Sequence, residues 1–385
     1  MRRRNDGDSS AEEKKDLLLV HESTASSDYI KVTYILKKDE VTYGALEALS
    51  FYLNTTSPAF NRFFRTKTEM SMTSSVRPVG GKYFLFSFLA CFPLRKGDGE
   101  ARSEIVRFLK FIKGGFSFNE KSHQLFLNYA SSVSEKDEKD ERRKMERYLG
   151  LNLIENNRLG LSPFKEGEDY NRLKLKQTYQ AVLSSPHLCI FIGNGEATTV
   201  LKLLSGLKIG SFVFPLELSE MPLGKKRELY KKDASELEGR IFRFPLLQSE
   251  RLFYLYLLFK EHLLIYKEKH SDFSSELYPY DGLLEVMSSD SVSSDFKKEA
   301  SLISEEEFQD LKKHFFLSHD PETIQAEEIA EEYEFLKLNG LKEDLGNMKE
   351  TVDGFTRDNY LEFLTSLQEA VHLHFGKENI FNDRV

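Results

Sequence analysis

The chain has 385 residues, with 54 lysines and arginines against 62 aspartates and glutamates and a formal net charge of −8. A content of 40% hydrophobic and 30% charged residues is typical of folded, water-soluble proteins, and this length allows two or three domains. The acidic charge gives no general attraction to phosphate, so we expect no nucleic-acid partner. The two cysteines, Cys91 and Cys189, lie in apolar runs and predict reduced thiols rather than a disulfide framework.

The N-terminus predicts a disordered tail. Residues 1–15 are rich in serine and charge, and no apolar segment follows the basic residues as a secretory signal requires. The most apolar stretch, Leu252–Tyr266, is shorter than the roughly 20 residues of a membrane span and contains Lys260, Glu261 and His262. It predicts a buried helix, and we therefore expect a cytoplasmic protein without a membrane partner.

Strand and helix patterns mix through the first part of the chain. Within Tyr29–Leu36 every second residue is apolar, which predicts a strand with one buried face, and the apolar run Tyr83–Cys91 is typical of a central strand. The predicted strands are Leu17–Val20, Tyr29–Leu36, Tyr83–Cys91 and His187–Ile192. The predicted helices are Val41–Leu53, Ala59–Lys67, Glu104–Lys113, Lys121–Tyr148, Arg172–Leu183 and Glu196–Leu204.

The second part repeats the opening order of elements. A change in composition with prolines and a basic cluster predicts a linker over residues 216–232. The strand Arg240–Leu247, a polar turn and the helix Arg251–Lys267 then repeat the order of Ile30–Leu53 about 210 residues later. This pattern predicts two repeats of one α+β unit, at residues 16–215 and 233–385. The remaining predictions are helices at Glu305–Phe316, Ala326–Leu338 and Asp358–Ala370 and a short strand at residues 372–375.

Short motifs for common chemistries are incomplete. Gly193–Gly195 follows a strand but lacks the rest of a phosphate-binding fingerprint, which favours a plain turn. His372 and His374 form an H-x-H pattern without a third ligand at short spacing, and His314 and His319 are five residues apart. A nucleophile motif of the G-x-S-x-G type does not occur.

The segment Gly44–Pro58, GALEALSFYLNTTSP, resembles the zinc-binding helix of the insulinase/pitrilysin family of inverted zinc peptidases, which carries H-x-x-E-H. Glu47 matches the general base of that motif, whereas Gly44 and Ala48 occupy its two histidine positions. The resemblance implies an α+β fold of two tandem repeats, each a mostly antiparallel sheet covered by helices. It extends over about residues 16–215, and over the second repeat mostly in pattern.

The family's third zinc ligand is a glutamate on a later helix. Matching Asn128 and Ser132–Glu135 to the family pattern puts that position on Phe126, with Glu120 and Glu135 on either side. Zinc needs lone-pair ligands and an open water position, and glycine, alanine and phenylalanine side chains provide none. The resemblance thus implies a lost zinc site, and we expect no cofactor. For Glu47, an ordinary solvated helix residue is the alternative interpretation.

These residues lead to one main hypothesis. The chain is expected to be a catalytically inactive, insulinase-like protein that pairs with another insulinase-like half or with itself, because it has the length of one half of the family's clamshell. It is also expected to bind an extended peptide by strand addition. The strand edge proposed for that peptide is Tyr83–Cys91, with Tyr83, Leu85, Ser87 and Leu89 as its residues.

Two other classes of function stay open. The chain could be an active metallopeptidase with displaced zinc ligands, for example His21 or His123 with nearby carboxylates. It could instead be an interaction protein that binds a basic partner through the acidic helices of Glu305–Leu338.

Overall fold

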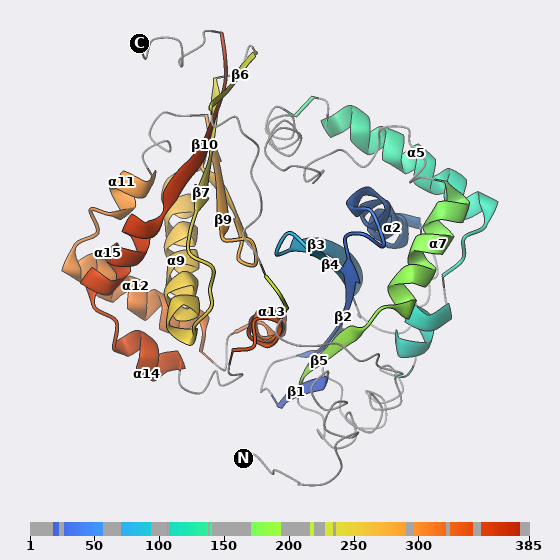
Figure 1. The fold of residues 1–385 in the computed structure, drawn as a ribbon, viewed down its shortest axis with the longest axis horizontal. Helices are drawn as coiled ribbons and strands as arrows, with labels where there is room; N and C mark the ends of the chain where they lie inside the picture. The colour runs from blue at the N-terminus through green and yellow to red at the C-terminus, as the bar shows by residue number, and fades with distance from the viewer. Residues whose placement is uncertain are drawn as a thin grey trace.

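The computed structural model describes residues 18–22, 27–56, 71–93, 106, 108–114, 116–137, 139–140, 171–193, 216–218, 228–233, 236–289, 296–320, 324–341 and 348–377. Two five-stranded sheets, each with its own helices, lie side by side (Figure 1). The predicted tail, the helices predicted at Ala59–Lys67 and Glu196–Leu204, and most of the predicted linker lie outside the described residues.

The first sheet has the strand order β1-β5-β2-β4-β3. Strand β1 pairs parallel with β5, and the other neighbours are antiparallel. The strands are β1 (Leu18–Glu22), β2 (Ser27–Lys37), β3 (Ser71–Val79), β4 (Tyr83–Pro93) and β5 (His187–Gly193). The helices are α2 (Tyr43–Thr56), α5 (Glu120–Asp137) and α7 (Arg172–Ser184), and residues 108–114 are also helical.

The second sheet has the order β6-β10-β7-β9-β8. Strand β6 pairs parallel with β10, and the other neighbours are antiparallel. The strands are β6 (Glu228–Lys232), β7 (Leu237–Arg243), β8 (Ser274–Tyr278), β9 (Leu283–Ser288) and β10 (Gln368–Gly376). The helices are α9 (Glu250–Lys269), α11 (Phe296–Ala300), α12 (Glu305–Ser318), α13 (Ala326–Leu338), α14 (Met348–Asp353) and α15 (Arg357–Ser366).

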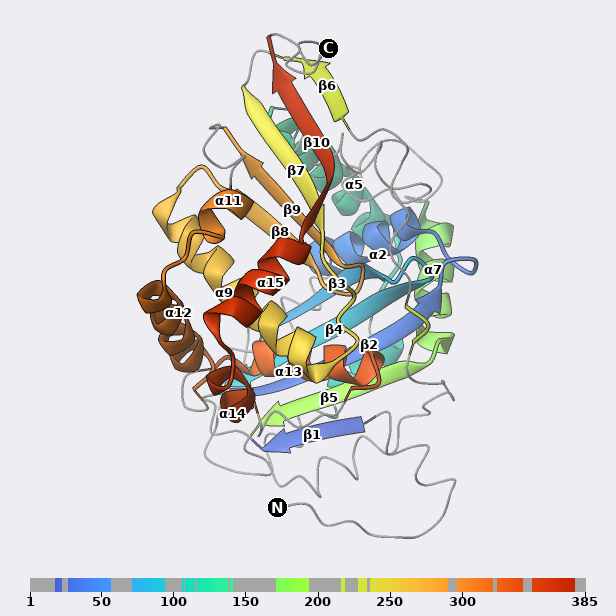
Figure 2. The ribbon, with the colours of Figure 1, turned by 60° about the vertical axis from the view of Figure 1, so that its left-hand side comes forward.

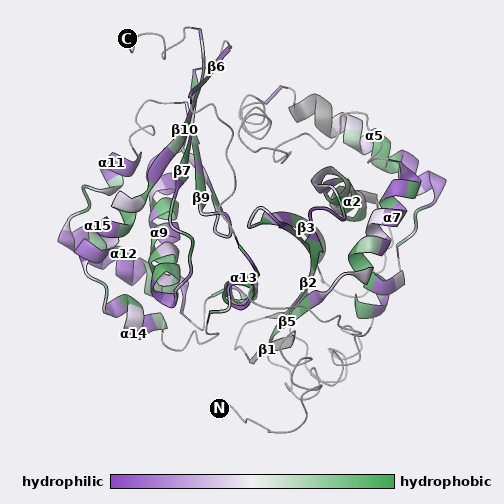
Figure 3. Ribbon diagram, in the orientation of Figure 1, coloured by the Kyte–Doolittle hydropathy of each residue, from purple (hydrophilic) through white to green (hydrophobic). Residues whose placement is uncertain are grey.

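The two sheets share one topology. In each, the first strand of the repeat lies parallel beside the last, and the second strand lies between the last and the fourth. This arrangement confirms the predicted α+β fold of two tandem repeats with mostly antiparallel sheets covered by helices. In Figure 3, the covering helices α5 and α7 carry both hydrophilic and hydrophobic residues, as a helix does that contacts a sheet on one side.

The alternation in β2 sets the core of the first repeat. Ile30, Val32, Tyr34 and Leu36 point toward α2 and α7 and join one buried apolar cluster, as their period of two predicts. The cluster also contains Phe84, Phe86 and Phe88 of β4 and Leu46, Leu49 and Leu53 of α2. The residues between them on β2 point to the opposite face of the sheet.

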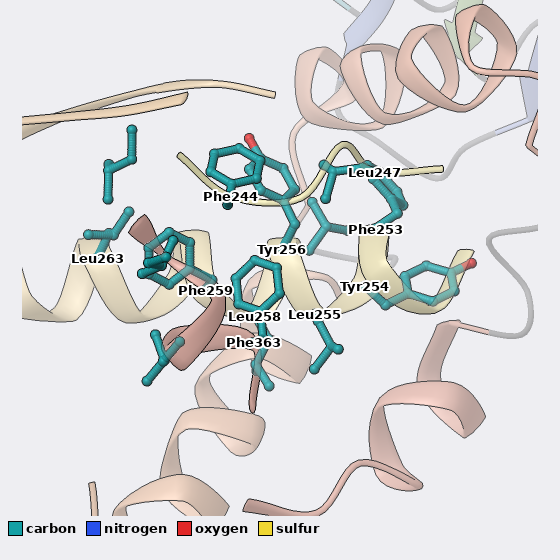
Figure 4. Close-up of a cluster of buried hydrophobic side chains, with 14 of the residues drawn as sticks. Phe244, Leu247, Phe253, Tyr254, Leu255, Tyr256, Leu258, Phe259, Leu263 and Phe363 are labelled. Carbon is teal, nitrogen blue, oxygen red and sulfur yellow. The ribbon is translucent and has the colours of Figure 1, made fainter. Parts of the chain in front are cut away.

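Helix α9 forms the centre of the second repeat. The Ser249 hydroxyl caps its N-terminus by accepting a hydrogen bond from the Leu252 N–H. Phe253, Tyr254, Leu258 and Phe259 are buried around much of its circumference (Figure 4), which explains the apolar run in the sequence. Among the described residues, none of the helices combines the length and apolar character that a membrane span requires.

Helix α13 belongs to the second repeat but packs on the sheet of the first. Figures 1 and 2 place it between the two sheets, across β5 and β2. Ile329, Ala330 and Tyr333 contact Ile190 and Ile192 in one buried cluster. The predicted acidic surface over Glu305–Leu338 is therefore wrong for this helix, because its inner face is apolar and its residue Glu334 is only 1% exposed.

Three other predictions need correction. Residues 228–232 were expected in a linker but form strand β6, which extends the second sheet beside β10. The helix expected at Asp358–Ala370 ends at Ser366, and β10 begins at Gln368. The strand expected at Arg240–Leu247 is β7, which begins at Leu237 and ends at Arg243.

Candidate functional site

Helix α2 is the element that resembles a zinc helix. It begins at Tyr43, where the Thr42 hydroxyl accepts a hydrogen bond from the Ala45 N–H at 3.3 Å. Gly44 and Ala48 are one turn apart and lie on the same side of the helix. Ala48 is fully buried in the apolar cluster of the first repeat. At these two positions the helix offers no side chain with a lone pair.

Phe126, at the predicted third ligand position, lies on α5 where this helix packs against α2. Its ring is fully buried, with centroid distances of 5.7 Å to Phe51 and 5.4 Å to Tyr52. The Tyr52 hydroxyl donates a hydrogen bond to the Ser117 carbonyl at 2.6 Å, which fixes the start of α5 against α2. The structure thus brings the predicted helix to α2, but the contact is aromatic and lies one turn beyond Ala48.

The side chains near Phe126 do not supply a ligand in its place. Glu120 forms an ion pair with Arg172 of α7, with 3.1 Å between Oε2 and the guanidinium nitrogen. His123 stacks on Phe126 with 6.1 Å between the ring centroids. The side chains of His21 and Glu135 lie outside the described residues. In the described part of the chain, no three or more His, Cys, Asp or Glu side chains are grouped so that they could hold a metal ion.

Glu47 is not the solvated residue that the alternative interpretation expected. Its side chain is half-buried, and loss of solvent raises its pKa to about 8. Burial is the largest cause of the raised pKa of Tyr43, and the negative charges of Glu47 and of the exposed Glu276 of β8 raise it further. The face of α2 that carries Glu47 therefore looks toward β8 of the second repeat, where Tyr278 bonds to Glu276. Sequence spacing gives no signal for this neighbourhood, because its members come from different repeats.

The expected peptide-binding edge is wrong for β4. Tyr83, Leu85, Ser87 and Leu89 lie on a strand that pairs with β2 on one side and with β3 on the other. Their backbone groups are thus used within the sheet. Their side chains are mostly buried, since Leu85 and Ser87 are 1% and 4% exposed. The end of the described sheet next to α2 is β3 instead.

Three of the four histidines singled out in the sequence lie beside carboxylates. On β10, His372 and His374 have their Nε2 atoms 3.5 Å from Glu238 and 3.9 Å from Glu236. His319 has its Nε2 3.1 Å from Glu332, and this carboxylate raises the pKa of His319 against the opposing effect of burial. The hydroxyl of the neighbouring Ser318 donates to Glu261 Oε2 at 3.0 Å.

Both cysteines carry free thiols, as predicted. Cys189 is fully buried, and burial raises its pKa to about 12, whereas Cys91 is half-buried at the end of β4. Gly193 ends β5 as expected, and residues 194–195 lie outside the described residues.

Neither a scan of protein-family models nor a search of curated proteins finds a match to this sequence. Solved structures do match. A peptidase M16 inactive domain from Pseudomonas fluorescens is 10% identical, with 94% of this chain and 95% of that chain covered and a TM-score of 0.62. A protease from Helicobacter pylori is 11% identical, with 94% and 98% covered and a TM-score of 0.62. A chain of Complex III2 from Candida albicans is 12% identical, with 94% and 93% covered and a TM-score of 0.60.

The chain has an M16-type fold. This agrees with the resemblance to insulinase-like peptidases in the sequence, and it covers both repeats rather than the first alone. At identities of 10–12%, these structures show which fold the chain has but do not show which reaction, if any, it catalyses. Within the M16-type fold, function must therefore be argued from Gly44, Glu47, Ala48 and Phe126 themselves.

Proposed function

We propose that this chain is a catalytically inactive, insulinase-like protein that acts as a non-catalytic subunit of a protein complex. The observation that carries this proposal is the chemistry of α2 and α5. Ala48 and Phe126 are fully buried among apolar side chains, and Gly44 has no side chain. Without a metal-bound water, a half-buried Glu47 has no nucleophile to activate.

The proposed partner is a protein of the same fold, either a catalytic half or a second copy. In support, similar folds occur both in an M16 inactive domain and in Complex III2. A cytoplasmic location is part of the same proposal and rests on the free thiols and the sequence of the N-terminus.

An extended peptide would bind at β3 rather than β4. Within the described sheet, β3 pairs only with β4, so the opposite edge of Ser71–Val79 is the one that an added strand can reach. At Ser74 this edge is already occupied, because Asn54 of α2 accepts from the Ser74 N–H and the Ser50 hydroxyl donates to the Ser74 carbonyl. An added strand would therefore pair with the edge residues on either side of Ser74.

The first test is zinc content with peptidase activity. Purified protein, dialysed against buffer without metal, is expected to contain far less than one equivalent of zinc by elemental analysis and to leave a mixed peptide library uncleaved. One retained equivalent of zinc would contradict the proposal. Cleavage that is lost with a chelator and with Glu47→Gln would favour a metallopeptidase with displaced ligands.

The second test is the native assembly. Size-exclusion chromatography of the protein from its source, followed by mass spectrometry of the co-eluting chains, is expected to find a partner of M16-type fold or a homodimer. A monomer at physiological concentration would remove the subunit role. Partner binding that disappears in high salt would favour binding of a basic partner through exposed acidic helices such as α12.

A further inference from the structure

A cavity of about 50 Å³ lies where the two repeats meet, and it is not near Gly44 or Ala48 on the zinc-like helix. Strand β3 contributes Arg77, helix α9 contributes Tyr256 and Lys260, and the turn before β9 contributes Tyr280. Helix α13 closes it with Glu332 and Phe335. Both repeats therefore build this cavity, and it exists only in the assembled fold.

Two buried polar atoms of its lining lack a hydrogen-bond partner within the described part of the chain. They are the hydroxyl of Tyr280, a residue that is 2% exposed, and Oε2 of Glu332, which is 6% exposed. An unsatisfied buried polar atom costs free energy, so such atoms usually bond to a group that the protein chain does not supply.

The missing group is a hydrogen-bond donor. Glu332 already uses Oε1 to pair with His319, at 3.1 Å, and Oε2 can only accept when the carboxylate is ionised. Of the cations at the cavity, Arg77 already forms an ion pair with Glu331, at 3.1 Å. An ammonium group donates three hydrogen bonds, which is enough for both Glu332 Oε2 and the Tyr280 oxygen.

The cavity also has aromatic walls. The rings of Phe253 and Phe335 are stacked with 4.9 Å between their centroids, and the centroid of the Tyr280 ring lies 4.9 Å from that of Phe335. Aromatic faces attract organic cations and accommodate the methylene chain that carries them. The walls thus suit an ammonium group on an aliphatic chain better than an inorganic ion.

We propose that this cavity binds a primary ammonium group on a short aliphatic chain, either from a lysine side chain of a bound polypeptide or from a free alkylamine. The ammonium donates to Glu332 Oε2 and to the Tyr280 hydroxyl oxygen, and its methylene groups lie against the rings of Phe253 and Phe335. This site is independent of the zinc-like helix and of the proposed loss of catalysis.

The test uses the full chain and three probes in isothermal titration calorimetry and saturation-transfer NMR. The probes are n-butylammonium, its neutral isostere n-butanol, and Nα-acetyl-lysinamide. We expect n-butylammonium to bind at least about tenfold more tightly than n-butanol, because the ammonium is charged and donates three hydrogen bonds, whereas the hydroxyl of n-butanol is neutral and donates one. Glu332→Gln should weaken n-butylammonium binding at least about tenfold, and Tyr280→Phe should weaken it several-fold.

Glu327→Gln is the matched control, since Glu327 is exposed on the same helix, and it should leave binding unchanged. Far-UV circular dichroism shows whether each variant is folded. Tyr280→Phe removes only the hydroxyl group and keeps the aromatic ring in the wall of the cavity. Equal binding of n-butanol, or no binding of n-butylammonium, would overturn the proposal and leave a cavity that holds water. Binding of Nα-acetyl-lysinamide as tight as that of n-butylammonium would assign the site to a lysine side chain, and binding of n-butylammonium alone would assign it to a free amine.

Discussion

The sequence around Glu47 is compatible with a solvated helix residue, but the side chain is half-buried in the structure. The residue lies on an amphipathic helix, yet its carboxylate has lost solvent. Loss of solvent makes the ionised carboxylate less stable than the neutral form, and this raises the pKa of Glu47 to about 8. Such a residue lowers the free energy of unfolding at alkaline pH, and this effect can be measured without knowledge of a substrate.

We predict that Glu47→Gln stabilises the protein increasingly as the pH rises. Because the folded pKa of about 8 exceeds the unfolded value of 4.5, the native protein loses stability between these pH values, and glutamine does not. At pH 9 the gain should be on the order of 2 kcal/mol, since one pKa unit corresponds to about 1.4 kcal/mol and partial exposure reduces the effect. Urea unfolding at pH 5 and pH 9 measures it.

Glu40→Gln serves as the control for this measurement. Glu40 is exposed, just before α2, and its substitution should change stability little at either pH. A Glu47→Gln effect that is the same at pH 5 and pH 9 would show that the carboxylate is not desolvated in the folded protein.

The helices that carry Gly44, Ala48 and Phe126 could be predicted from the sequence, but the surroundings of Glu47 could not. Helical spacing put Gly44 and Ala48 on one side of α2, and the motif order put Phe126 on the helix that packs there. Near α2 lies β8, whose Glu276 acts on the pKa of Tyr43, and the short segment of mixed residues in this strand carries no clear alternation. Local patterns do not report contacts between repeats.

At the scale of single elements, α13 shows how the two repeats are held together. Its residue Glu334 accepts a hydrogen bond from Lys31 of β2 at 2.8 Å, and the Thr33 hydroxyl also donates to this carboxylate. Lys31 and Glu334 are 2% and 1% exposed, so neither charge has water to replace its partner. This buried pair fixes α13 on the sheet of the first repeat.

We predict that Lys31→Met destabilises the protein by about 3–5 kcal/mol, because it leaves the carboxylate of Glu334 buried without its counter-charge. The double variant Lys31→Met with Glu334→Leu should recover most of that loss, since both charges are then removed. Lys82→Met is the control: its pair with Glu217 is exposed, and the change should be below about 1 kcal/mol. A double variant as unstable as Lys31→Met would mean that packing, and not the unpaired charge, sets the loss.

The ends of α13 were predicted residue by residue, whereas four strands were missed: β3, β8, β9, and β6, whose residues were expected in the linker. Apolar periodicity defines Ala326–Leu338 because one face of the helix is buried. Strand β3 is rich in serine and threonine, and β8 is only half-buried, so both lack the apolar alternation by which strands are recognised. Strand β9 is apolar on both faces, and such a run does not show which secondary structure it forms.

At the scale of the molecule, equivalent hairpin turns of the two repeats meet. Asp281, in the turn between β8 and β9, faces the backbone N–H groups of Gly80 and Gly81 in the turn between β3 and β4. Gly80 has a φ of +55°, and an added Cβ would lie 2.6 Å from Leu218 Cδ2, so the backbone angle and the contact with Leu218 both favour glycine in this turn. Burial raises the pKa of Asp281 to about 7, although Lys38 and the glycine N–H groups act against it.

We predict that Asp281→Asn makes stability less sensitive to pH between about 4 and 7. The folded pKa of about 7 lies above the unfolded value of 3.8, so the native protein loses stability as the pH rises through this range. Asparagine is not ionised and still accepts a hydrogen bond from the glycine N–H groups. Thermal unfolding at pH 5 and pH 8 should show a smaller drop in Tm for the variant, and an unchanged drop would exclude Asp281 as its source.

The cores of the two repeats are continuous, which decides how the chain unfolds. Ile35, Val79 and Leu85 belong to the first sheet, but they are buried in the apolar cluster that surrounds α9 of the second repeat. Interfaces of this kind couple two units into one cooperative transition, because neither unit can open without exposing the core of the other. The free energy of either repeat alone is therefore not a separable quantity.

We predict a single calorimetric transition for the whole chain and a loss of about 2–4 kcal/mol for Ile35→Ala, because Ile35 is 2% exposed in that shared core. The substitution lies in the first repeat, yet signals from tyrosines of the second repeat, such as Tyr254, should shift to lower temperature together with the calorimetric peak. Two transitions, of which Ile35→Ala moves only one, would mean that the repeats fold separately. In that case the cavity between them would form after the repeats have folded, and the lysine-sized ligand proposed for it would bind with a Kd that depends on how they dock.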